Sequence, residues 1–185
     1  MKKALISNIG KIGEALSRLF SKVRKITDRV WYKTEWTISK YADEAAFLAG
    51  NPFATTIVKN NVLLNEGIGE MIDLFCGIGG TAFSEANAYI GVGDSDTAAA
   101  ATQTALQAVT NKAYKAMEAD YPVRANQTVT FRSVFDGSSG NFAWKEFSVA
   151  NGNSDLSKNL NRKVSDQGTK ISGQTWTVDL AITFS

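Results

Sequence analysis

The sequence predicts an α+β protein in which a coiled-coil-like helical arm precedes an antiparallel β-sandwich. Two observations predict this fold class. Apolar residues recur with a period of 3.5 residues from Leu5 to Val30, which is the repeat of a coiled coil. Apolar and polar residues alternate strictly over residues 175–184, as in a strand with one buried face. We therefore expect a basic helical arm at 1–50, a helical linker at 51–80 and the sandwich at 81–185.

Eight apolar residues form the seam of the predicted coiled coil. Their spacing alternates between four and three without interruption: Leu5, Ile9, Ile12, Leu16, Leu19, Val23, Ile26 and Val30. Such a narrow seam suits side chains that each insert between residues of a facing helix. Isoleucine at d positions disfavours a parallel dimer and favours a trimer. We expect this seam to be the oligomerisation or docking site.

Charge is distributed unevenly along the chain. Residues 1–30 hold eight Lys and Arg residues against two acidic ones, a net charge of +6, whereas residues 31–185 carry −4. A basic amphipathic helix can pack on its own domain, lie on an anionic membrane or contact nucleic-acid phosphates. Sustained heptads are a coiled-coil signal, so we favour a protein partner and do not expect nucleic acid.

Composition bears on location and on chemistry. No run approaches the about 20 apolar residues of a membrane-spanning helix, and the basic start lacks a signal-peptide cleavage site, so we expect assembly in a cytoplasm. The single cysteine, Cys76, excludes an internal disulfide and is expected to be buried. The chain contains no histidine, which excludes Ser-His-Asp and Cys-His catalytic arrangements. We expect no enzyme activity, no cofactor and no metal site.

Helices are predicted up to residue 80. A second helix at 41–49 follows a candidate N-cap at Ser39, unless one bent helix runs from 3 to 49. A third helix is predicted at 60–75, and the glycines of residues 77–80 close it. Its apolar stripe consists of Leu63, Leu64, Ile68, Met71, Ile72 and Phe75.

Short strands with turns rich in Gly, Asn and Asp follow, which is typical of a sandwich. We expect a turn at 94–97 and a hairpin loop at 136–140, and leave 98–108 open between a helical turn and an extended loop. The strands are predicted at 89–92, 127–135, 142–149, 156–164, 168–171 and 175–184.

Three features could carry chemistry. The glycine-rich segment 77–80 lacks the Lys-Ser/Thr ending of a phosphate loop and follows a helix, so a helix C-cap is favoured. Asp94 and Asp96 could touch calcium, but the closing Glu is absent and a turn is favoured. Trp144 and Trp176 could stack on a sugar, and a core position is favoured.

Seven phrases between residues 60 and 185 resemble a family of virion proteins of tailed bacteriophages. They are NVLLNEGI at 61–68, IGVGD at 90–94, TAAAA at 97–101, NFAWKEF at 141–147, LNRK at 160–163, GTK at 168–170 and WTVDL at 176–180. The resemblance implies a small β-sandwich of the fibre, collar or head-decoration type, with no catalytic residues.

The predicted function is that of a non-enzymatic virion structural protein, either a head decoration or a tail or fibre component. Its expected partners are other capsid or tail proteins and further copies of itself, and its expected location is the virion. Two alternatives remain at this point. One is a carbohydrate- or receptor-binding module that uses loops 136–140 and 151–158 to contact a host-surface glycan. The other is a membrane-surface protein that uses the basic helix.

Overall fold

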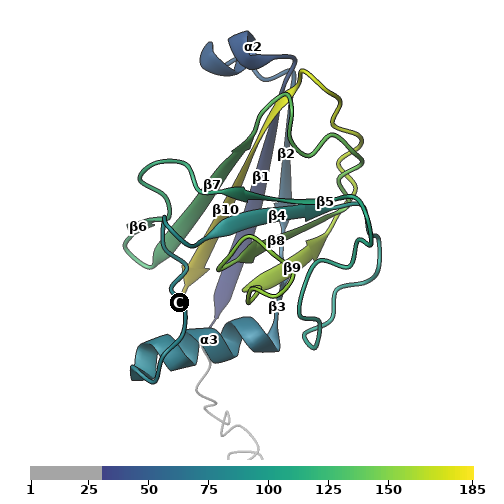
Figure 1. Cartoon of the computed structure of the whole chain (residues 1–185). Coiled ribbons are helices and arrows are strands. Elements are labelled where there is room, and N and C mark those ends of the chain that lie inside the picture. Colours follow the sequence, from purple (N-terminus) through teal and green to yellow (C-terminus); the bar gives the residue numbers. More distant parts are fainter. Residues whose placement is uncertain (1–30) are drawn as a thin grey trace, which may run out of the picture. The chain divides into compact units, whose positions relative to one another are not determined.

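The computed structural model describes residues 31–185, which form two five-stranded antiparallel sheets (Figure 1). The first sheet has the order β2-β1-β10-β7-β6 and the second has the order β3-β9-β8-β4-β5. The elements are β1 (Tyr32–Tyr41), α2 (Glu44–Leu48), β2 (Ala54–Lys59), β3 (Val62–Leu63), α3 (Asn65–Cys76), β4 (Tyr89–Gly93), β5 (Lys112–Ala116), β6 (Val123–Ala125), β7 (Thr128–Phe135), β8 (Glu146–Ala150), β9 (Asn161–Val164) and β10 (Thr175–Phe184).

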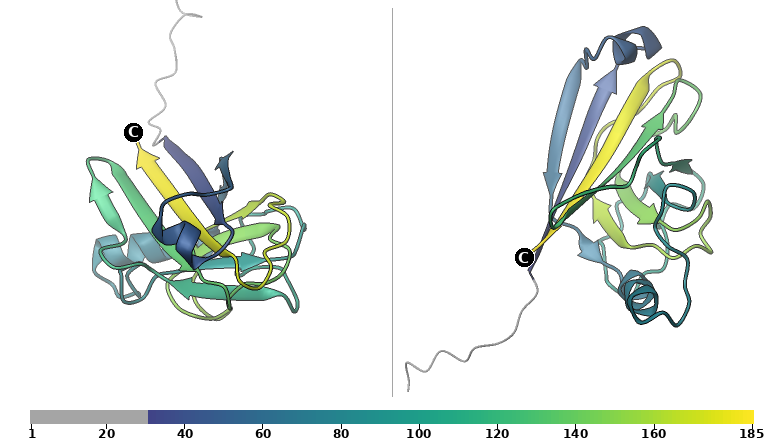
Figure 2. Two further views of the ribbon diagram at one scale, coloured as in Figure 1. Left: turned by 90° about the horizontal axis from the view of Figure 1, so that it is seen from above. Right: turned by 90° about the vertical axis from the view of Figure 1, so that its left-hand side faces the viewer.

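The two sheets lie as separate layers, and the strands of the second run across those of the first (Figures 1 and 2). This arrangement matches the orthogonal class of sheet packing. The antiparallel, β-rich character predicted from the sequence is confirmed. The arm predicted before residue 31 lies outside the described residues.

Aromatic side chains dominate the core between the sheets. Trp144 is fully buried and meets Phe135 and Trp176 edge-on, each with ring centroids 4.8 Å apart. Its indole Nε1 donates a 2.8 Å hydrogen bond to the carbonyl of Gly140, so the polar atom of this large side chain is satisfied. The prediction that Trp144 and Trp176 are core residues is confirmed.

The last strand follows its predicted pattern. Trp176, Val178, Leu180 and Ile182 on β10 are buried in the core. The strand occupies the centre of the first sheet and pairs with β1 on one side and β7 on the other. Strict alternation over ten residues therefore marked a central strand with one face in the core.

Residues 32–41 correct the prediction of helix. They form β1, which pairs with β10 along its whole length from Tyr32 opposite Phe184 to Tyr41 opposite Thr175. Thr34, Trp36 and Ile38 are buried, at a spacing of two. A helix would turn Trp36 away from the face shared by Thr34 and Ile38, whereas a strand puts all three on one face.

The sandwich therefore begins earlier in the sequence than predicted. β1 and β2 belong to the first sheet, so the sandwich begins near residue 31, where we predicted an arm up to 50 and a linker at 51–80. The helix predicted at 41–49 is reduced to α2, and its N-cap is Asp43 where Ser39 was predicted. The Asp43 carboxylate accepts a 2.8 Å hydrogen bond from the amide of Ala46.

Several loops also differ from prediction. The segment 136–140 is no hairpin loop, because β7 pairs with β10 and β6 while β8 lies in the other sheet. The predicted strands at 142–149 and 156–164 shorten to β8 and β9, and the piece at 168–171 forms only a bridge between Ala143 and Thr169. Residues 98–108 form a loop without regular structure.

This loop is tied to the second sheet by a buried ion pair. Arg162 Nε lies 2.6 Å from Glu146 Oε2, and both side chains are fully buried. Glu146 also accepts hydrogen bonds from the amides of Gln107 (2.9 Å) and Ala108 (2.7 Å), while Arg162 Nη1 donates to the carbonyl of Thr97 (2.9 Å). The ends of the loop are thus held by charge-assisted hydrogen bonds.

Candidate functional site

The eight predicted seam residues all precede residue 31 and lie outside the described part of the chain. Two surfaces of residues 31–185 have the character of binding sites. One is the outward face of α3, and the other is a cup on the outer face of the first sheet. Neither was identified from the sequence.

Helix α3 turns apolar side chains to solvent. Ile68, Ile72 and Phe75 are 37%, 53% and 92% exposed, and Ile78 just beyond the helix is 72% exposed. Positions 68, 72 and 75 follow one helix face, so the exposed side chains form a continuous stripe. The apolar stripe predicted on this helix is therefore only partly buried. Cys76, predicted to be buried, is exposed.

The face of α3 that meets the sandwich carries small and polar side chains beside Met71. Glu66 accepts a 2.7 Å hydrogen bond from the amide of Asn159, and Glu70 accepts hydrogen bonds from Asn151 Nδ2 (3.0 Å) and the amide of Thr81. Burial raises the pKa of Glu66 above its ordinary value. Gly67 lies between these two carboxylates and is buried. Polar anchoring therefore acts together with the packing of Met71 against the core.

Gly67→Ala tests this close approach. A Cβ at residue 67 would lie 2.5 Å from Leu160 Cα and 2.7 Å from the carbonyl oxygen of Asn159, so the helix would have to move away. We expect the substitution to lower the free energy of unfolding by about 1–3 kcal/mol, as overpacking does. Denaturant titration measures this change.

Gly69→Ala is the matched control, because a Cβ at residue 69 meets nothing within 4 Å on the same helix. Alanine is the better helix former, so this variant should gain about 0.5–1 kcal/mol. If both variants shifted stability equally and in the same direction, the proposed close approach of α3 would be incorrect.

The charged side chains in the stretch of sequence that contains α3 are all acidic. The 52 residues from 60 to 111 contain no Lys or Arg and six acidic side chains, namely Glu66, Glu70, Asp73, Glu85, Asp94 and Asp96. The helix lies at the end of the sandwich beside β3 (Figure 1). An exposed apolar stripe within an acidic stretch is suited to a basic, amphipathic partner.

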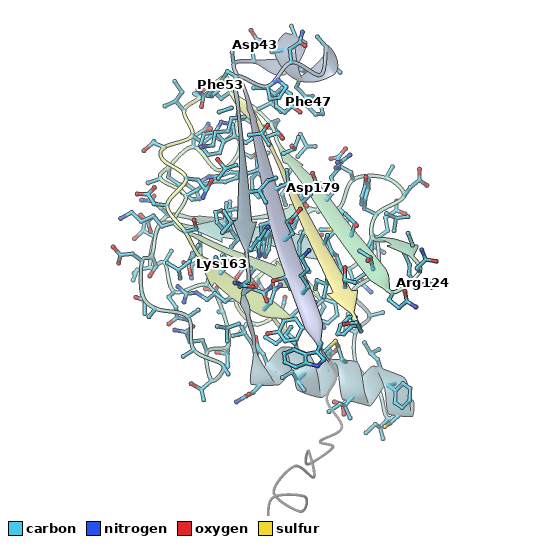
Figure 3. The ribbon with its side chains drawn as sticks, turned by 180° about the vertical axis from the view of Figure 1, so that it is seen from behind. Asp43, Phe47, Phe53, Arg124, Lys163 and Asp179 are labelled. Carbon is cyan, nitrogen blue, oxygen red and sulfur yellow. The ribbon has the colours of Figure 1, made fainter. Side chains whose placement is uncertain are left out.

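The second surface is a cup on the solvent-facing side of the first sheet, with a cavity volume of about 330 Å³. Its floor is made by β1, β7 and β10, and its rim by α2 and the turn at 118–121. Figure 3 views this side of the molecule, with Asp179 on β10 and Phe47 on α2. The lining residues are Ser39, Tyr41, Phe47, Glu118, Ala119, Tyr121, Arg132, Val134, Thr177 and Asp179.

A paired arginine and aspartate form the polar part of the floor. Arg132 Nε and Nη2 donate to Asp179 Oδ1 (2.5 Å) and Oδ2 (3.1 Å), in the bidentate arrangement of a guanidinium and a carboxylate. Asp179 and Arg132 are opposite each other in the register of β10 and β7. The bond to Asp179 raises the pKa of Arg132 above its ordinary value, so the guanidinium stays charged.

Aromatic rings form the walls. The Arg132 guanidinium carbon lies 5.0 Å from the centroid of the Tyr121 ring, a cation–π contact that holds the guanidinium in place. On the opposite side, Tyr41 and Phe47 meet edge to face with centroids 5.4 Å apart. Three aromatic rings therefore line the same cup as the ion pair of Arg132 and Asp179.

The turn at 118–121 is held against β7. The amide of Glu118 donates a 2.9 Å hydrogen bond to the carbonyl of Arg132, and the amide of Tyr121 donates to the carbonyl of Glu118 (3.1 Å). These bonds place the Glu118 carboxylate and the Tyr121 ring at the cup. The segments that line the cup lie far apart in sequence, so no local motif could predict the site.

The motifs singled out from the sequence have structural roles. Gly77 is the left-handed C-cap of α3, with φ of 67°, as predicted. Asp94 accepts a hydrogen bond from Asn111 Nδ2 (2.7 Å), and Ser95 Oγ accepts one from the amide of Thr97 (3.2 Å), so the segment is a hydrogen-bonded turn. Within residues 31–185, no three Cys, Asp or Glu side chains gather where they could hold a metal ion.

Comparisons of the chain with protein-family models, curated proteins and solved structures found no match. None of the described helices is long and apolar enough to cross a membrane.

Proposed function

We propose that this chain is a non-enzymatic structural protein of a tailed-bacteriophage virion, serving as a head decoration or as a tail or fibre component. In this proposal a helical N-terminal segment oligomerises or docks, and the sandwich is presented to neighbouring virion proteins. The observation that supports an assembly role best is the exposed apolar face of α3, because contiguous apolar surface marks interaction sites. The resembling phrases fall on α3, on β3, β4, β8 and β9 of the second sheet, and on β10 of the first.

The partner we propose for the α3 face is a second copy of this chain. Residues 1–30 combine a net charge of +6 with an apolar seam, whereas residues 60–111 contain no basic side chain at all. Apolar burial would supply affinity at about 25 cal/mol per Å². Opposite charges would set orientation and speed association. One chain thus supplies the chemistry of both sides of an interface.

The oligomeric state of the full-length protein tests this proposal. We expect a trimer by sedimentation equilibrium. Leu16→Asp with Leu19→Asp should shift it to monomer, because two buried charges in the seam each cost several kcal/mol. Ile72→Asp with Phe75→Asp should weaken association as well, since both side chains lie on the exposed face of α3.

Ile171→Asp is the control, because Ile171 is 57% exposed and lies in the loop that precedes β10. It should sediment as the wild type does. A wild-type chain that remains monomeric at all concentrations, or a seam variant that still forms the native assembly, would contradict the proposal.

A further inference from the structure

We propose that the cup on the outer face of the first sheet binds a neutral saccharide. This inference does not depend on the proposed assembly role, because none of its residues lies on α3 or in residues 1–30. The cup is a different surface from loops 136–140 and 151–158, which were considered from the sequence. Trp144, the stacking residue considered there, is fully buried and cannot meet a ligand.

The balance of charge in the cup disfavours ionic ligands. Arg132 is neutralised by Asp179, and Glu118 adds a second carboxylate. An anion would therefore meet two carboxylates. A cation would find the face of Tyr121 occupied by the Arg132 guanidinium and Asp179 already paired with it. A neutral ligand avoids the repulsion that an anion meets and needs neither of these two groups.

The remaining hydrogen-bonding capacity of the cup suits hydroxyl groups. Arg132 uses Nε and Nη2 on Asp179, which leaves the Nη1 hydrogens as donors toward a ligand. Each carboxylate oxygen of Asp179 accepts one hydrogen bond here and has capacity for another, and Glu118 supplies further acceptors. A hydroxyl both donates and accepts, so neighbouring sugar hydroxyls can satisfy a fixed donor and fixed acceptors together.

The walls supply the apolar part of such a site. Tyr41 and Phe47 present ring surface on one side and Tyr121 on the other. A pyranose ring has an apolar face of C–H groups that can lie against an aromatic ring, while its hydroxyls point to the floor. The volume of about 330 Å³ lies at the lower end of the range for small-molecule sites.

The polar side chains of the cup are already held in place without a ligand, which favours binding. The bidentate pair and the cation–π contact hold Arg132 before a ligand arrives, so little rotamer entropy is lost on binding. Asp179 is fixed by the same bonds, and its side chain is 17% exposed. The polar floor is therefore preorganised.

Ligand-detected saturation-transfer NMR on the full-length protein tests the proposal. The neutral probes are maltose, cellobiose, lactose and chitobiose, and the charged probes are N-acetylneuraminic acid and tetramethylammonium. We expect saturation of at least one neutral disaccharide and none of the charged probes. Phe47→Ala should weaken binding about fivefold or more through lost stacking, and Asp179→Asn should weaken it by a similar factor.

Ile57→Ala is the matched control, because Ile57 is exposed on β2 of the same sheet and does not line the cup. It should bind as the wild type does. Phe47 lies on the short helix α2 outside the core, so its variant keeps the test valid even if Asp179→Asn unfolds. The proposal is overturned if no neutral probe binds, if a charged probe binds better, or if Phe47→Ala binds unchanged.

Discussion

Replacing Arg162 with alanine is expected to destabilise the protein by about 3–5 kcal/mol. The substitution would leave Glu146 fully buried without its cation, since the two groups lie 2.6 Å apart at zero exposure. It would also release the carbonyl of Thr97, which Arg162 holds at 2.9 Å. Guanidinium unfolding monitored by tryptophan fluorescence measures the loss.

A surface ion pair provides the control. Lys112 pairs with Asp155 where both side chains are partly exposed, so Lys112→Ala should cost less than about 1 kcal/mol. A double variant, Arg162→Met with Glu146→Gln, removes both charges and should recover part of the loss. A small effect of Arg162→Ala, equal to that of Lys112→Ala, would mean that the pair does not secure the 98–108 loop.

Trp144→Ala is expected to cost about 3–5 kcal/mol through cavity formation. The indole is fully buried and contacts Phe135, Phe147 and Trp176 through edge-to-face pairs. Trp144→Phe should cost less, because it keeps most of the aromatic contacts and loses the hydrogen bond to the Gly140 carbonyl. Thermal unfolding should rank the wild type above the Phe variant and the Phe variant above the Ala variant.

Leu156→Ala serves as the control for this series, since a side chain that is 94% exposed should change stability by no more than about 0.5 kcal/mol. If Trp144→Ala were as stable as the wild type, the core described here would be wrong. This prediction also separates stability from binding. If Trp144→Ala no longer bound a saccharide, the cause would be unfolding. If Phe47→Ala no longer bound one, the cause would be the lost contact in the cup.

Strands were predicted correctly where the alternation of apolar and polar residues was long. The prediction was wrong where a different pattern preceded the strand. β10 and β7 were predicted within a residue of their observed ends, because one face of each lies in the core. β1 was assigned to a helix because it follows directly after the heptad seam. Its spacing of two, with Thr34, Trp36 and Ile38 buried, was the signal that could have found it.

Helix α3 was predicted as an element, but its sequence pattern did not show which of its faces is buried. On a surface helix, an apolar stripe such as Ile68, Ile72 and Phe75 typically packs on the core. The structure instead buries Gly67 and Glu70, because Gly67 allows backbone contact with Leu160 and the carboxylate accepts buried hydrogen bonds. No local pattern reports a partner that lies 93 positions further along the chain.

Periodicity alone thus specified an antiparallel β-rich body, its last strands and the C-cap of α3, because side-chain alternation and glycine dihedral freedom are properties of adjacent residues. Contacts across the fold decided the rest. They placed β7 and β8 in different sheets, turned the apolar face of α3 outward and brought Phe47, Tyr121, Arg132 and Asp179 around one cup. The physical reason is that the pairing of distant segments depends on how the whole core packs. This packing energy depends on residues from many segments, so no short stretch of sequence determines it.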